Sequence, residues 1–146
     1  IVTVASTAGF PYAYNSCKDH IQQRIKNMSR MDEVTACAKE FVEDVRLEKH
    51  SVRGWPNSCY GMSKLLLIKW MNLLSSSLKS KSSALINTYC PGYCKTDMSS
   101  QRGHRSAAKG AETCVYLATL TNTNTTGGFY QDKEIVKGST EALGFK

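Results

Sequence analysis

The sequence predicts an α/β protein with part of a doubly wound parallel sheet, whose strands are joined by crossover helices. Short apolar segments rich in β-branched residues alternate with longer segments in which apolar residues recur at helical spacing. Their order is strand, insertion, helix, strand, helix, strand, and it extends over all 146 residues. We interpret residues 1–146 as the C-terminal half of one such domain, with a helical insertion at about 15–52.

The first strand is expected at residues 1–5, "IVTVA", which are apolar apart from Thr3. Such a segment is typical of a parallel strand that is buried on both faces. Gly9 and Pro11 then interrupt regular structure, and the polar residues 15–28 indicate a loose helix followed by a connection.

A longer helix is expected from Met31 to Glu48, inside the insertion. Ser29, with Asp32 three residues later, resembles a weak capping box at its start. Apolar residues at helical spacing mark a buried face, and charged residues between them are expected to face water. The buried face consists of Val34, Ala38, Phe41 and Val45, and the solvent face of Glu40, Glu43, Asp44 and Arg46.

The remaining elements follow from alternating turns and apolar segments. We expect a turn at 53–58, a helix from about 58 to the serines at 75–77, a buried strand at 84–90, a sharp turn at 91–93, a helix at 106–120, a polar turn at 121–128 and a short strand at 128–132.

Composition excludes several classes of function. The longest apolar stretch, around 65–74, is short and interrupted by Lys69 and Asn72, so no membrane span is expected. The net charge of +7 lies entirely in residues 51–146. Its basic residues are scattered without aromatic interleaving or a nucleic-acid motif, so no nucleic-acid partner is expected, and a solvated surface or attraction for an anionic cofactor explains the charge.

The six cysteines form no C-x-x-C pair, so we expect reduced thiols of a cytoplasmic protein rather than a disulfide framework. The three histidines show no ligand spacing to one another or to a cysteine pair, so no metal site is expected.

Tyr60 and Lys64 stand at the head of the apolar helix, four residues apart, and a helix places such residues on one face. An ammonium group there would favour the phenolate form and make the tyrosine a usable proton donor and acceptor near neutral pH. A lysine stem packed beside a core tyrosine explains the spacing equally well. Tyr14 and Lys18 have the same spacing, but they lie in a polar stretch with no apolar periodicity.

Three polar features follow or face the carboxyl ends of the expected strands, where parallel sheets bind ligands. Ser6 follows the first strand, Tyr60 heads the next helix, and Pro91-Gly92 ends the second strand. A serine after a strand often caps a helix, and Pro-Gly is common in turns. The expected topology nevertheless brings all three to one edge, where they would surround one carbonyl group.

The segments "IVTVAST", "CYGMSK" and "CPGYCKTDM", in this order, resemble the second half of the short-chain dehydrogenase/reductase superfamily. The long gap between Ser6 and Tyr60, "GWPNSCYGMSK", "GAETCVYLATL" and "GGFYQDKEIV" are most similar to its carbonyl reductase branch. The resemblance covers nearly the whole chain and implies a Rossmann-like, NAD(P)-binding domain. It also implies NADPH-dependent reduction of quinones, aldehydes or ketones by hydride transfer from the nicotinamide.

The resemblance implies a role for each matching residue. Tyr60 would donate a proton to the substrate carbonyl, and Lys64 would promote its ionisation and bind the cofactor ribose. Ser6 would orient the carbonyl oxygen, although Thr7 is a weaker rival for this role. The nicotinamide side of the cofactor site would comprise Pro91, Gly92, Cys94, Lys95 and Thr96.

The resemblance further implies a monomer, because the inserted helix covers a face that relatives use to pair. A glycine-rich phosphate-binding turn is absent from these residues, and so is a counterpart of the upstream catalytic asparagine. We therefore expect a piece of a longer enzyme that is inactive alone, or alternatively a binding protein built on the same half-fold. The substrate stays unnamed, with Phe10, Tyr12, Tyr93 and Met98 expected to form an apolar wall.

Overall fold

A computed structural model describes residues 1–121 and 125–145. Its sheet has the order β1-β2-β3-β4, in which β1 (Val2–Val4), β2 (Asn87–Cys90) and β3 (Phe129–Gln131) are parallel. The last strand, β4 (Glu134–Ile135), pairs with β3 in antiparallel fashion and was not expected from the sequence. The parallel part of the sheet confirms the predicted α/β class.

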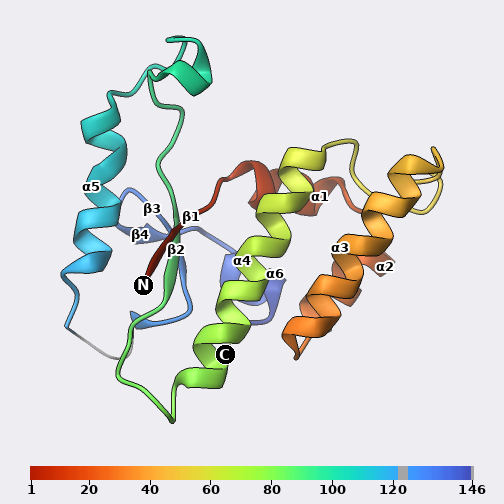
Figure 1. Ribbon diagram of the computed structural model, residues 1–146, viewed down its shortest axis with the longest axis horizontal. Helices are drawn as coiled ribbons and strands as arrows, with labels where there is room; N and C mark the ends of the chain where they lie inside the picture. Colours follow the sequence, from red (N-terminus) through yellow and green to blue (C-terminus); the bar gives the residue numbers. More distant parts are fainter. Residues whose placement is uncertain (122–124, 146) are drawn as a thin grey trace.

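Two long helices cover opposite faces of this sheet (Figure 1). Helix α4 (Cys59–Leu78) begins at Ser58, whose side chain accepts a hydrogen bond from the Gly61 backbone N–H at 3.0 Å. Helix α5 (Ala107–Ala118) begins in the same way at Ser106, which accepts from Lys109 N–H at 3.1 Å. Both helices agree with the expected ranges, because serine caps and buried apolar residues act locally.

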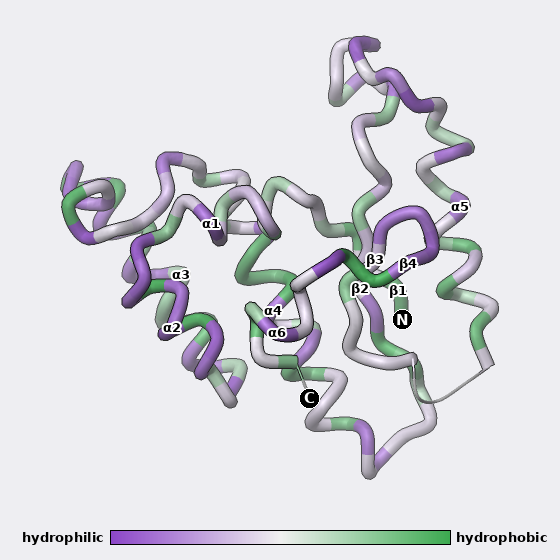
Figure 2. The backbone as a smooth tube through the Cα atoms, turned by 180° about the vertical axis from the view of Figure 1, so that it is seen from behind, coloured by the Kyte–Doolittle hydropathy of each residue, from purple (hydrophilic) through white to green (hydrophobic). Residues whose placement is uncertain are grey.

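The insertion is helical and packs beside α4. It contains α1 (Tyr14–Ser16), α2 (Asp19–Asn27) and α3 (Met31–Arg46), and α3 packs against α4. Figure 2 shows hydrophilic stretches along α2 and α3 and the hydrophobic strand β1. Three short elements were not expected as helices: η1 (Ala8–Ala13), η2 (Asp97–Ser99) and α6 (Ser139–Leu143).

The main core lies between the sheet, α4 and the insertion, where Ile25, Met62, Leu65, Ile68 and Phe129 are fully buried. A smaller cluster under α5 contains Tyr89, Leu117 and Tyr130.

The expectation that residues 1–5 are buried on both faces is wrong. Ile1 is 65% exposed and Val4 is 49% exposed. In the part of the chain that the structure describes, β1 has a hydrogen-bonded neighbour on one side only, β2, and β-branched residues alone did not indicate this edge position. The second strand is also shorter than expected, because residues 84–86 lie outside β2.

Two details of the insertion differ from expectation. Asp44 is buried rather than facing water, since its carboxylate accepts from Trp55 Nε1 at 2.8 Å and pairs with Arg53 at 3.0 Å. At the start of α3, Glu33 rather than Asp32 completes the cap, accepting from the Ser29 and Arg30 backbone N–H groups at 2.8 and 3.0 Å.

The helix in the insertion ends at Arg46, two residues earlier than expected, because Glu48 has a left-handed backbone with φ of 56°. The expected turn at 121–128 includes residues 122–124, which lie outside the described residues.

Candidate active site

A cavity of about 1010 Å³ lies at the carboxyl ends of β1 and β2. Its lining comes from the end of β1 and the residues that follow it to Ala8, from Tyr12 in η1, from the first two turns of α4, from the chain between 89 and 99, and from the start of α5. Ser6, Tyr60, Lys64, Pro91, Gly92, Cys94 and Thr96 are all among its lining residues. Lys95 is exposed and is not among them. The structure therefore brings together all of the predicted catalytic and cofactor-binding residues except Lys95.

Tyr60 and Lys64 lie on the face of α4 that borders this cavity. The Lys64 Nζ atom is 5.7 Å from the centre of the Tyr60 ring, so the charge lies close to the phenol. The same Nζ donates to the Val4 carbonyl at 3.4 Å, which holds the lysine across the gap between α4 and β1. Tyr60 is 54% exposed, so it is not a core tyrosine.

Ser6 lines the cavity from the segment directly after β1. Its Oγ accepts a hydrogen bond from the Ala8 backbone N–H at 3.1 Å, and its carbonyl accepts from Gly9 N–H at 2.9 Å. A serine hydroxyl that accepts from the backbone keeps its own proton for donation. Such a group can donate a hydrogen bond to an oxygen atom in the cavity.

Two glycines allow the walls to approach each other. A Cβ atom on Gly9 would lie 2.5 Å from Leu65 N, and one on Gly61 would lie 2.8 Å from the Ala8 carbonyl oxygen. Segment η1 and the first turns of α4 are therefore in contact through their backbones. This close packing places the residues after β1 beside Tyr60 and Lys64.

The turn after β2 forms the third wall. Gly92 has φ of 77°, a left-handed conformation that favours glycine. The Pro91 carbonyl accepts from Cys94 Sγ at 3.4 Å, and Gly92 N–H donates to Cys90 Sγ at 3.4 Å. Thr96 begins η2, where its backbone N–H donates to Ser99 Oγ at 3.1 Å.

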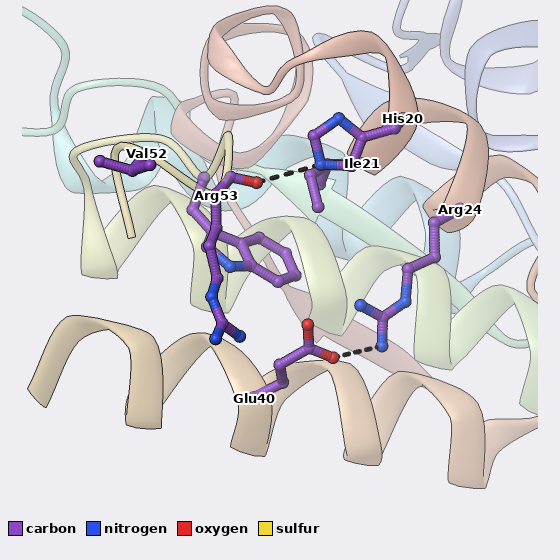
Figure 3. A pocket seen from close by; sticks show the side chains of 7 residues that line it. His20, Ile21, Arg24, Glu40, Val52 and Arg53 are labelled. Carbon is purple, nitrogen blue, oxygen red and sulfur yellow. Dashed lines mark hydrogen bonds and ion pairs between the residues drawn. The ribbon is translucent and has the colours of Figure 1, made fainter. Parts of the chain in front are cut away.

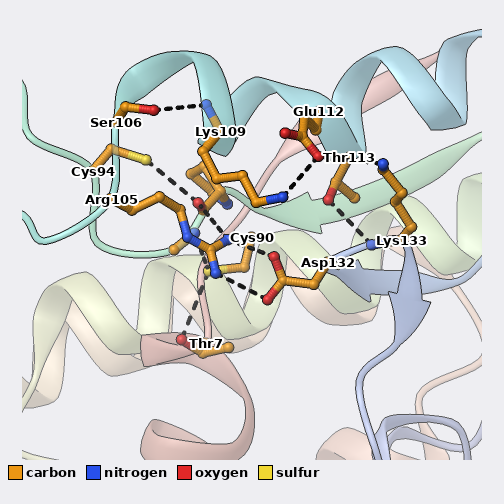
Figure 4. Close-up of polar contacts among 12 residues, drawn as sticks. Thr7, Cys90, Cys94, Arg105, Ser106, Lys109, Glu112, Thr113, Asp132 and Lys133 are labelled. Carbon is orange, nitrogen blue, oxygen red and sulfur yellow. Dashed lines mark hydrogen bonds and ion pairs between the residues drawn. The ribbon is translucent and has the colours of Figure 1, made fainter.

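Sequence reasoning missed two contacts at this edge, which Figure 4 shows. Thr7 Oγ1 lies 3.7 Å from Cys90 Sγ, linking the ends of β1 and β2. Arg105 forms a two-pronged ion pair with Asp132, at 2.6 and 3.0 Å. No local motif marks these pairs, because strand pairing brings together residues far apart in the chain.

The expected apolar wall is correct in part. Tyr12, Tyr93 and Met98 line the cavity, and the Tyr93 ring lies 5.8 Å from that of His104. Phe10 instead belongs to the core and packs against Tyr14 at 5.5 Å, because the backbone at Phe10 is extended within η1. Tyr14 is buried as well, and its hydroxyl donates to the Ala142 carbonyl, so the Tyr14–Lys18 spacing is structural.

A second cavity, of about 290 Å³, lies in the insertion (Figure 3). Its charged groups are mutually satisfied: Arg24 pairs with Glu40 at 2.7 Å and lies 5.9 Å from the Trp55 ring centre. His20 Nε2 lies 3.0 Å from the Arg53 carbonyl. These contacts join α2, α3 and the following loop, so we interpret the charged groups around this cavity as stabilising the fold.

Residues 1–121 and 125–145 also bear on the questions of metal sites, membrane-spanning helices and disulfide bonds. No cluster of three or more metal-ligating side chains occurs among them, and no helix there is long and apolar enough to cross a membrane. All six cysteines are free thiols.

The parallel sheet, its crossover helices and the cavity at the strand ends define a Rossmann-like α/β protein. Salutaridine reductase from Papaver somniferum has a similar structure, with a TM-score of 0.76 at 24% identity over 90% of this chain and 44% of its own. No protein-family model matches the chain.

Curated relatives identify the family more narrowly. Carbonyl reductase (NADPH) 3 of Rattus norvegicus is 39% identical over 82% of this chain and 44% of its own length. Carbonyl reductase (NADPH) 1 of Sus scrofa is 33% identical over 94% of this chain and 49% of its own. The chain belongs to the short-chain dehydrogenase/reductase superfamily and is homologous to the C-terminal part of its carbonyl reductases. It spans about half the length of these relatives.

Proposed function

We propose that this chain carries the catalytic half of an NADPH-dependent carbonyl reductase acting on quinones, aldehydes or ketones. The observation that carries the proposal is that Ser6, Tyr60 and Lys64 line one cavity at the carboxyl ends of two parallel strands. The relatives are named as carbonyl reductases that use NADPH, which supports the same reaction.

The groups that line the cavity fit the nicotinamide side of NADPH. We assign this side to Pro91, Gly92, Cys94 and Thr96, with Lys64 available to the ribose and Lys95 lying outside the cavity wall. When bound, NADPH supplies the hydride that reduces the carbonyl carbon. The 146 residues contain no glycine-rich phosphate-binding turn, so we expect them to bind NADPH only weakly by themselves.

The protein side of the reaction is proton donation and charge stabilisation. As the carbonyl oxygen gains negative charge, the Ser6 hydroxyl donates a hydrogen bond to it, and Tyr60 transfers its phenolic proton to it. Lys64, beside the ring and fixed on the Val4 carbonyl, stabilises the phenolate left behind. The product is an alcohol from an aldehyde or ketone and a hydroquinone from a quinone, and Tyr60 regains its proton from solvent.

The test is Tyr60→Phe in the protein translated from the full open reading frame. We expect kcat to fall by at least about 10²-fold, because general acid catalysis contributes on the order of 10²–10⁴. Affinity for NADPH should stay nearly unchanged. Tyr116→Phe, an exposed tyrosine on α5 outside the cavity, is the matched control. Comparable turnover for Tyr60→Phe and wild type would refute the assignment.

We also propose that the full-length enzyme is a monomer. Helix α3 packs along α4, the helix that carries Tyr60, and so covers a face of α4 that could otherwise pair with a second copy. Light scattering after size exclusion measures the mass directly, and a dimer whose interface includes α4 would contradict this.

One observation favours the alternative, a catalytically inactive binding protein. Among residues 1–121 and 125–145, β1 has β2 as its hydrogen-bonded neighbour and no strand on its other side, and unpaired strand edges can dock other chains. This alternative requires the 146-residue product to be folded and monodisperse by itself. A molten or aggregating product in circular dichroism and sizing would exclude it.

A further inference from the structure

Arg105, in the segment between η2 and α5, pairs through its backbone with the chain that follows the Pro91–Gly92 turn. Its N–H donates to the Tyr93 carbonyl at 3.2 Å, and its carbonyl accepts from Lys95 N–H at 2.7 Å. These two hydrogen bonds form an isolated parallel bridge centred on Cys94. Arg105 is therefore fixed beside the cavity wall before its side chain is considered.

The guanidinium group of Arg105 lies against the turn itself. A Cβ atom on Gly92 would be 3.1 Å from both Cζ and Nη1, so a larger residue there would require the guanidinium group to shift. Nη1 also lies 3.4 Å from the Pro91 carbonyl oxygen, a long hydrogen bond. The group thus contacts both residues of the turn, on which the nicotinamide side of the proposed site depends.

Asp132 holds the other side of the guanidinium group (Figure 4). Its carboxylate accepts from Nη1 at 2.6 Å and from Nη2 at 3.0 Å, the two-pronged geometry that gives arginine–carboxylate pairs their directionality. Strand register explains the proximity: Cys90 pairs with Gln131, so the residues that follow them, Pro91 and Asp132, emerge at the same end of the sheet.

Asp132 is itself anchored to α5. It occupies the turn between β3 and β4 with φ of 52°, and the next residue, Lys133, donates its N–H to Thr113 Oγ1 at 3.2 Å. The Lys133 ammonium also pairs with Glu112 at 3.3 Å. These contacts of Lys133 tie the turn that carries Asp132 to α5.

The charges of the pair reinforce this geometry. The Arg105 side chain is only 21% exposed, whereas that of Asp132 is 51% exposed. The hydrogen bond from Arg105 lowers the pKa of the Asp132 carboxyl, so the pair stays ionised at neutral pH.

We propose that Arg105 and Asp132 act together as positioning residues that fix the Pro91–Gly92 turn in the conformation that NADPH binding requires. This proposal rests on the proposed function. It assigns no contact with the cofactor to either residue. Arg105 acts through the turn, and Asp132 acts through Arg105.

The test compares Arg105→Gln, Asp132→Asn and the double variant in the full-length protein. We expect each single variant to raise the Kd for NADPH about ten-fold, the scale of one charge-assisted hydrogen bond. The double variant should be no worse than either single one, because the two residues act as one unit. Arg105→Lys should recover only part of the affinity, since an ammonium group cannot donate in the same fork.

Asp132→Asn is the decisive variant. If Arg105 merely attracts an anionic cofactor, removing the neighbouring negative charge should tighten NADPH binding. If the pair positions the turn, the same substitution should weaken binding. Tighter or unchanged binding in Asp132→Asn overturns the proposal.

Hydrogen exchange of the peptide spanning 91–98 provides a readout that needs no activity. The Lys95 amide, bonded to the Arg105 carbonyl, should exchange faster in both single variants. Unchanged exchange would overturn the proposal that Arg105 and Asp132 fix the turn. Arg46→Gln breaks an equivalent two-pronged pair with Glu43 on α3, at 2.8 and 2.6 Å, and is the matched control. A wild-type protein that binds no NADPH would refute the proposed function. The exchange data alone would then show whether Arg105 and Asp132 fix the conformation of the turn.

Discussion

Replacing Gly9 by alanine tests whether the contact between η1 and α4 determines the shape of the cavity. The new Cβ atom would lie 2.5 Å from Leu65 N and 2.7 Å from the Lys64 carbonyl carbon. Ordinary contact begins at 3.4 Å, so the methyl group is about 0.9 Å too close to α4. Both neighbours are backbone atoms, and no side-chain rotation can relieve the overlap. Segment η1 and α4 must therefore move apart by roughly this distance.

Two consequences follow from that displacement. Overpacking of this kind costs about 1–3 kcal/mol of unfolding free energy, which urea denaturation measures. Because Ser6 precedes η1 and Lys64 is on α4, the separation also moves apart the groups that would surround the carbonyl. A misplacement of about 1 Å lowers turnover by on the order of 10²-fold. Carbonyl reduction by the full-length protein with saturating NADPH measures this second effect.

The matched control is Gly138→Ala, where the nearest atom to the new Cβ is Phe10 Cζ at 3.9 Å. Gly138 has φ of 79°, so this variant loses stability through backbone strain, on the order of 1 kcal/mol, without pushing on α4. Its turnover should match wild type. If Gly9→Ala has wild-type stability and turnover, the contact does not determine the cavity and the reasoning is wrong.

Three further predictions concern buried groups of the insertion. Asp44→Ala should cost about 1–3 kcal/mol in urea denaturation, because the buried Trp55 N–H loses its acceptor, and a cost below 0.5 kcal/mol would contradict this. Burial raises the pKa of the Cys17 thiol to about 12 and that of Cys37 to about 11. Iodoacetamide at pH 8 should therefore label the exposed Cys59 well before these two, and equal rates would refute their burial. The folded state retains thiol protons that the unfolded chain releases, so stability should fall as pH rises above about 9.

Local patterns predicted most of the helices. Helices α4 and α5 begin close to the expected positions, and the structure shows Ser58 and Ser106 capping them, since a cap depends on the neighbouring N–H groups of the same chain segment. The same patterns failed where a distant partner decides. Asp44 follows the solvent-facing pattern of α3, yet Trp55 and Arg53 from the next loop enclose it.

The residues of the candidate site also divide into those that local patterns predicted and those whose position depends on distant contacts. Tyr60 and Lys64 are four residues apart on one helix, so their common face was predictable from spacing alone. The sharp turn at Pro91-Gly92, at the end of the second strand, was also predictable from the sequence. The prediction that Phe10 lines the cavity was wrong, because the backbone at Phe10 is extended inside η1 and its side chain packs in the core.

The sequence by itself determined the α/β class, the crossover helices, and the tyrosine–lysine pair at the head of α4. These features arise from residues within one or two helical turns of each other. Only the tertiary structure decided that Gly9 and Gly61 let η1 contact α4, and that Arg105 lies between the Pro91–Gly92 turn and Asp132. These contacts depend on strand register and on the packing of two backbones. Both are set by free energies summed over the whole fold, which no local pattern records.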